Sequence, residues 1–264
     1  MYNDPEQRET ETKNISSVYK TLADEILPQL RRARLTANYD VIGRSDEEIN
    51  EAFDTDAKVL SANELLYAAT LTNDKARQEA IYKKTTELYP NDFRAYNNLG
   101  MMAYANGDFT TAENYFKQAA SKDANAPEVN TNLGYIELVK GNVANAETYL
   151  SKSTGANTAN EALGNLYIKQ GQYDRAVQAF GDTKTNSAAL AQILAKDYNK
   201  AKNTLNAVKN PDAYTDYLMA IVGARTNNAD LVKTSMAKVA QKDATLAAKA
   251  QIDREFAKYA NEIK

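Results

Sequence analysis

The chain has 264 residues and a net charge of −3 at pH 7, from 32 lysines and arginines against 35 aspartates and glutamates. It contains no histidine, cysteine or tryptophan, which excludes imidazole and thiol catalysis, disulfides and thiolate-bound metals. The balanced charge lacks the basic excess of nucleic-acid-binding proteins, so we expect no nucleic-acid partner. No apolar run approaches the roughly 20 residues that span a bilayer, so we expect no membrane span.

Catalysis would have to use carboxylates, lysine, tyrosine, serine or threonine, and these residues form no local motif in the sequence. The acidic stretch from Asp46 to Asp56 lacks the spacing of a calcium-binding loop and is typical of the start of a helix. We therefore expect no catalytic residues, no cofactor and no metal site.

The first fifth of the chain differs from the rest. Residues 13–30 have the apolar spacing of a helix, and residues 31–41 alternate apolar and polar side chains as in a half-buried strand. Ser45 and Glu48 have the spacing of a capping box, which predicts a short helix from Asp46. Two interpretations of residues 13–42 stay open: an extended strap on the following repeats, or the end of a further domain that precedes this chain.

Three later stretches, 97–119, 131–153 and 161–183, repeat one pattern. Each has leucine and glycine, a turn glycine, a small residue and then a large apolar residue at constant spacing. The equivalent positions are Leu99, Leu133 and Leu163; Gly100, Gly134 and Gly164; Gly107, Gly141 and Gly171; Ala112, Ala146 and Ala176; and Phe116, Leu150 and Phe180. This pattern resembles the tetratricopeptide repeat (TPR), a helix–turn–helix unit of 34 residues.

The resemblance implies an all-α solenoid, a right-handed superhelix in which small residues let the two helices of each repeat approach closely. Three weaker copies extend the array. The first covers 59–92, with Leu65-Leu66 at the leucine-glycine position and Tyr82 at the aromatic position. The second is shortened, with its first helix near 187–195, and the third is a degenerate copy over 212–243. Residues 246–263 are predicted to form one amphipathic capping helix. The predicted organisation is an N-terminal helix and strand segment over 1–58 and about five to six repeats over 59–264.

In TPR proteins the first helices of successive repeats line a concave groove that holds an extended peptide. By this resemblance the groove residues are Asn63, Tyr67, Asn97, Asn98, Met101, Asn132, Tyr135 and Asn165. An asparagine side chain both donates and accepts, so a row of asparagines can pair with a peptide backbone of any sequence. The alternative is that these asparagines are simply solvated. A TPR carboxylate clamp would need cations, and only Arg94 and Lys169 are candidates, two repeats apart, so an internal peptide or loop fits better than an acidic tail.

The sequence thus predicts a non-catalytic scaffold that binds an extended peptide or partner segment in the groove. Residues 13–42 are also similar to part of the α/β domains beside TPR arrays in Gram-negative envelope proteins, including domains resembling the peptidoglycan-associating domain of outer membrane protein A. This resemblance implies a second function, that of an envelope structural or assembly component that is periplasmic or outer-membrane-associated in a longer protein. A cytoplasmic location and a carboxylate-based enzyme also stay open.

Overall fold

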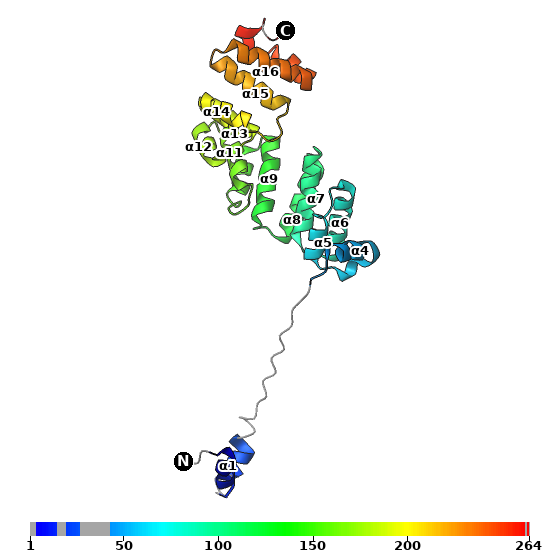
Figure 1. Cartoon of the computed structure of the whole chain (residues 1–264). Coiled ribbons are helices and arrows are strands. Elements are labelled where there is room, and N and C mark those ends of the chain that lie inside the picture. Colours follow the sequence, from blue (N-terminus) through cyan, green and yellow to red (C-terminus); the bar gives the residue numbers. More distant parts are fainter. Residues whose placement is uncertain (1–3, 15–19, 27–42, 262, 264) are drawn as a thin grey trace. The chain divides into compact units, whose positions relative to one another are not determined.

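The computed structural model describes residues 4–14, 20–26, 43–261 and 263, and within these ranges its regular elements are all helical (Figure 1). It divides into two compact units, Met1–Arg44 and Ser45–Lys264. The first unit contains α1 (Pro5–Asn14) and a π-helical turn, η1 (Leu22–Ile26). Of the helix predicted over 13–30, residues 13–14 and 20–26 are described and are helical. The strand predicted over 31–41 lies outside the described residues.

The second unit is a succession of helix pairs. It begins with α4 (Asp46–Asp56) and the 3₁₀ turn η2 (Ala57–Val59), and ends with α17 (Ala244–Ala250) and the 3₁₀ turn η3 (Arg254–Tyr259). Between them lie the pairs α5 (Ala62–Ala68) and α6 (Lys75–Leu88), α7 (Phe93–Ala105) and α8 (Phe109–Lys122), α9 (Pro127–Lys140) and α10 (Val143–Leu150), α11 (Ala159–Lys169) and α12 (Tyr173–Phe180), α13 (Asn186–Leu194) and α14 (Tyr198–Asn206), and α15 (Ala213–Arg225) and α16 (Ala229–Lys242).

The predicted capping box starts α4. The backbone N–H of Glu48 donates to Ser45 Oγ at 3.2 Å, and the N–H of Ser45 donates to Glu48 Oε2 at 2.7 Å. Ile49 of this helix is buried in one cluster with Leu60 and Leu65 of the first repeat. The compact unit accordingly starts at Ser45, while the division of the chain at residue 58 stays a prediction.

Glycine–large contacts set the separation of the paired helices. A Cβ atom placed on Gly100 of α7 would lie 2.5 Å from Cε1 of Phe116 on α8. The same measurement gives 2.5 Å from Gly134 to Leu150 Cδ2. Gly164 and Phe180 repeat the contact at 2.6 Å. The small–large pairing predicted from the sequence is confirmed, because a Cβ at any of these glycines would overlap the large side chain of the paired helix.

The turns between the paired helices show how far the repeat extends. Gly107, Gly141 and Gly171 have positive φ angles, and the shortened repeats have the same conformation at Lys196 (φ 63°) and Asn227 (φ 56°). At each turn the next residue donates its N–H to the carbonyl five residues back, for example Asp197 to Gln192 at 2.8 Å. This is the Schellman end of a helix. The first helices α13 and α15 therefore end in the same way as those of the three glycine-containing repeats.

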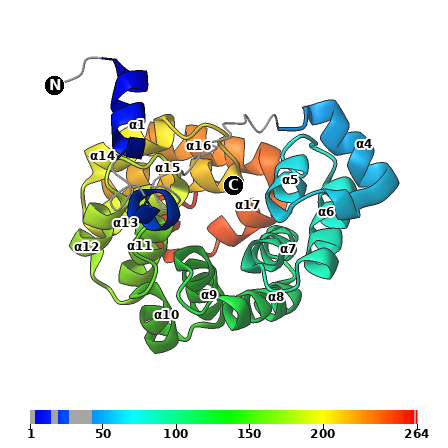
Figure 2. The same cartoon turned by 90° about the horizontal axis from the view of Figure 1, so that it is seen from below.

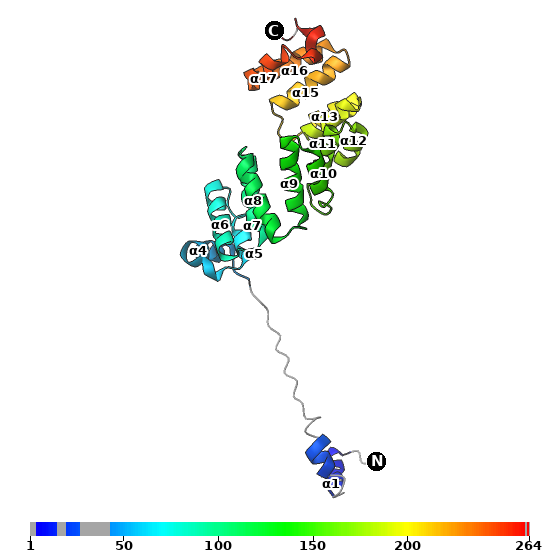
Figure 3. The same ribbon diagram turned by 180° about the vertical axis from the view of Figure 1, so that it is seen from behind.

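The pairs follow one another along a curved path from α4 to α16 (Figure 2). Consecutive first helices, from α7 through α9, α11 and α13 to α15, contact one another, and each second helix packs on the next first helix. The first helices therefore form the inner layer. Figure 3 shows the same succession from behind, with α17 against α16.

In the first repeat Tyr82, predicted at the aromatic position, packs against the cluster that contains the fully buried Ile81. One detail differs from the predictions. The single capping helix predicted over 246–263 is wrong, because α17 ends at Ala250 and η3 begins at Arg254. Asp253 causes the break: its carboxylate accepts from the N–H of Glu255 and from the hydroxyl of Tyr217 on α15. The break lets η3 cover the apolar end of the last pair, as a cap should.

The glycine contact yields the first testable expectation. Gly100→Ala should lower the free energy of unfolding by about 1–3 kcal/mol, because its Cβ overlaps the buried Phe116 ring. Urea unfolding followed by circular dichroism measures the change. Gly43→Ala is the matched control, since a Cβ there meets nothing within 4 Å. Equal stability of the two variants would contradict this account of the helix spacing.

Candidate functional site

A cavity of about 90 Å³ lies on the inner layer where three repeats meet. It is lined by Met101 and Tyr104 of α7, Phe116 of α8, Asn132 and Tyr135 of α9, and Thr158 just before α11. Met101 is 44% exposed and so connects the cavity to solvent. The Tyr104 ring packs edge-on against Phe109 and lies 6.4 Å from the Tyr135 ring, centroid to centroid. The lining is thus mainly aromatic and apolar, with few polar groups, as in protein sites that hold small apolar groups.

Tyr135 is the most strongly perturbed group in this lining. Burial, and then the negative charge of Glu161, raise the pKa of Tyr135 to about 12, while a hydrogen bond with Asn165 opposes the rise. The phenol therefore stays protonated at neutral pH and can act as a hydrogen-bond donor. Asn165 also donates to the backbone carbonyl of Glu161 at 3.0 Å. Glu161 and Asn165 of α11 consequently lie beside the edge of the cavity that Tyr135 forms.

The asparagines predicted to line the groove do not form a single row of side chains that all face it. Asn132 Nδ2 donates to Asn97 Oδ1 at 2.8 Å, and both side chains are buried. Asn98 hydrogen-bonds the hydroxyl of Tyr82 on α6, which places it at the contact between repeats. These amides therefore join neighbouring repeats, and of the three only Asn132 also lines the cavity.

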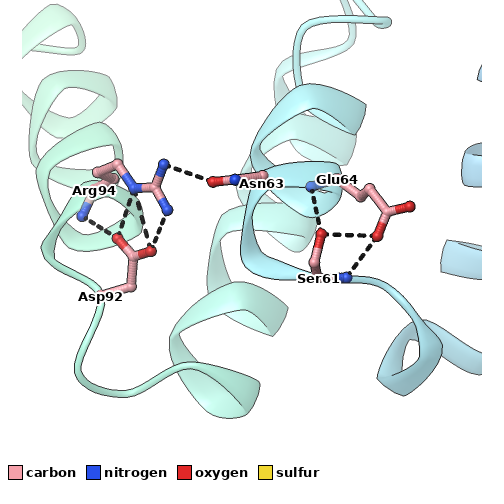
Figure 4. A network of polar contacts seen from close by, with 5 residues as sticks. All are labelled: Ser61, Asn63, Glu64, Asp92 and Arg94. Atoms are coloured by element: carbon pink, nitrogen blue, oxygen red, sulfur yellow. Dashed lines mark hydrogen bonds and ion pairs between the residues drawn. The ribbon is translucent and has the colours of Figure 1, made fainter. Parts of the chain in front are cut away.

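Asn63 and Tyr67 lie at the N-terminal end of the array. Arg94 Nη1 donates to Asn63 Oδ1 at 2.8 Å, while its guanidinium also pairs with Asp92 (Figure 4). The Arg94 side-chain hydrogen bond lowers the pKa of Asp92, so this carboxylate stays charged and balances the arginine. The hydroxyl of Tyr67 donates to Asp46 Oδ1 of α4 at 3.0 Å, although 47% of the residue is exposed. Arg94 is thus already engaged by a carboxylate, which disfavours a carboxylate clamp.

The structure brings together Met101, Asn132, Tyr135 and Asn165 around the cavity, and keeps Asn63, Tyr67 and Asn98 apart from it. Sequence reasoning missed Tyr104, Thr158 and Glu161. A usable signal existed: Tyr104 follows Met101 by three residues, and Glu161 precedes Asn165 by four, which are spacings that share a helix face.

Over the described ranges, no group of three or more carboxylates is placed to hold a metal ion. Among the described helices, none combines the length and the apolar character needed to cross a bilayer.

The pairing of the two asparagines gives a second expectation. Asn132→Ala should lower the free energy of unfolding by about 1–3 kcal/mol, because the buried Asn97 carbonyl loses its donor. The double variant Asn97→Leu/Asn132→Leu should recover part of this loss, since neither polar group is then left unpaired. Asn160→Ala, at an exposed position of α11, is the control for chemical denaturation. If Asn132→Ala and Asn160→Ala have the same free energy of unfolding, the hydrogen bond between the two asparagines does not stabilise the fold.

Known proteins share both the repeat pattern and the fold of this chain. Models described as tetratricopeptide repeat match residues 98–161, 81–114 and 161–184. No curated protein matches the chain. Among solved structures, a chain of the APC/C hetero-tetramer Cut9–Hcn1 superposes with a TM-score of 0.65 at 15% identity, over 81% of this chain and 45% of that one. This chain thus spans under half the length of that structure.

Two shorter proteins resemble the chain over nearly their whole length. A tetratricopeptide repeat protein from Parabacteroides merdae gives a TM-score of 0.55 at 13% identity, covering 83% of this chain and 90% of that one. PilW, described as a type IV pilus biogenesis factor, gives 0.54 at 18% identity, covering 75% and 97%. At these identities the likeness concerns the fold. Together with the three sequence matches and the recurring glycine contacts, it identifies residues 81–184 as tetratricopeptide repeats, within a helical array that has the fold of such repeats.

Proposed function

We propose that this chain is a non-catalytic protein–protein interaction scaffold that binds an extended peptide or partner segment along its inner helices. One observation carries the proposal: an apolar cavity lies at the exposed Met101, where the first helices of three repeats converge. A cavity of this kind on a protein surface is typical of a site that receives an anchoring side chain.

The repeat packing supplies the rigidity that such binding needs. Asn97 and Asn132 link α7 to α9, and Tyr135 and Asn165 link α9 to α11. The walls of the cavity are therefore held before a partner arrives, which reduces the ordering cost of association. Around the apolar anchor, the amides of Asn132 and Asn165 and the hydroxyl of Tyr135 supply the polar groups that can orient a peptide backbone.

Site-specific photo-crosslinking tests the proposal. A benzophenone amino acid at Met101 should yield covalent partner adducts in native cell extract, because this position lies at the mouth of the cavity. The same amino acid at Gln118, an exposed position on the second helix α8, is the matched control. The readout is the set of adduct bands unique to Met101, identified by mass spectrometry. Identical adducts at both positions, or none at Met101, would contradict groove binding.

A second candidate function is envelope assembly, favoured by the structural likeness to PilW, a pilus biogenesis factor. In this case the array would be the partner-binding part of a longer protein located in the periplasm or at the outer membrane. Fractionation of the tagged product of the complete gene measures this directly. We expect co-fractionation with envelope markers if the candidate is correct, and an exclusively cytoplasmic product would reject it.

A further inference from the structure

The size of the cavity limits the anchoring side chain. Its volume of about 90 Å³ is well below the roughly 150 Å³ at which an engineered apolar cavity accepts benzene. The walls are the rings of Tyr104, Phe116 and Tyr135 and the thioether of Met101. An aliphatic side chain fits this space and gains apolar contacts on several sides, whereas an aromatic ring needs more room.

Two carboxylates flank the cavity. On α11, Glu161 lies between Thr158, which lines the cavity, and Asn165, which bonds Tyr135; its charge also acts on the Tyr135 phenol. On α9, Glu128 precedes Asn132 by four residues and Tyr135 by seven, which places all three on one helix face. The inner surface beside the cavity therefore carries two carboxylates.

The nearby cations do not cancel these charges. Within the described part of the chain, neither Glu128 nor Glu161 forms an ion pair. Arg94 is paired with Asp92. Lys169 lies eight residues beyond Glu161 on α11, a rise of roughly 12 Å along the helix. A cation brought in by a partner would thus meet two carboxylates that are not committed elsewhere.

We infer that the groove selects a peptide segment in which a small aliphatic residue is adjacent, within about two residues, to a lysine or arginine. The inference rests on the proposed function and specifies the partner. The aliphatic side chain fills the cavity, and the cation lies against Glu161 or Glu128. In an extended peptide two residues span about 7 Å, so both contacts can be made at once. Acidic tails are repelled by the same carboxylates.

Selection from a display library of random twelve-residue peptides on the full chain tests this inference. We expect the enriched peptides to contain leucine, isoleucine or valine next to lysine or arginine. In a synthetic copy of one such peptide, replacement of the aliphatic residue by alanine should weaken binding roughly tenfold or more, because its buried contacts are lost.

Protein variants separate the charge contribution from the fold. Glu128→Gln/Glu161→Gln should weaken binding roughly two- to fivefold per charge, and 0.5 M salt should abolish that difference. Asp230→Asn, an exposed position on the second helix α16, removes a comparable charge away from the groove and should leave binding unchanged. Melting temperatures confirm that the variants are folded.

The outcomes distinguish this inference from the proposed function. The inferred specificity is wrong if the enriched peptides are neutral or acidic, or if they bind the Glu128→Gln/Glu161→Gln variant as tightly as the parent. If such peptides nevertheless lose binding to Met101→Ala, the groove still binds peptides. If they bind Met101→Ala unchanged, or if no peptide is enriched, both the specificity and the proposed groove function are overturned.

Discussion

The close approach of two helices at a glycine is the contact on which the rest of the array depends. At Gly100 and Gly134 the space of a side chain is filled by the partner helix, through Phe116 and Leu150. The contact recurs in three consecutive pairs, and the stacked pairs bring first helix against first helix. In these central repeats the continuous inner layer is thus a consequence of glycine at one position of the first helix.

The inner layer combines two roles in the same side chains. Asn132 ties α9 to α7 through Asn97 and also lines the cavity, and Tyr135 lines the cavity while bonding Asn165 of α11. Polar groups that hold neighbouring repeats therefore shape the site as well. A buried network of this kind is stable only when its members are paired, so the cavity walls have little freedom to rearrange.

The sequence predicts local features well and contacts between repeats poorly. Leucine, glycine and large apolar residues at constant spacing suffice to predict three helix pairs. Weaker copies of the pattern predict the pairs whose turns use Lys196 and Asn227 in place of glycine. The partner of Asn97 is 35 residues away, and the break at Asp253 depends on Tyr217, 36 residues earlier. Such pairs depend on how one repeat is rotated against the next, which the spacing within a repeat does not specify. The same limit explains why the asparagines were predicted as a groove-lining row.

Hydrogen–deuterium exchange of the full chain, with and without a bound peptide or partner segment, tests the central claim most directly. If the inner layer is the binding surface, added protection should be concentrated in α7, α9 and α11, around Met101, Tyr135 and Asn165. Protection concentrated instead in the second helices α8, α10 and α12 would contradict the claim, because those helices form the opposite layer of the array.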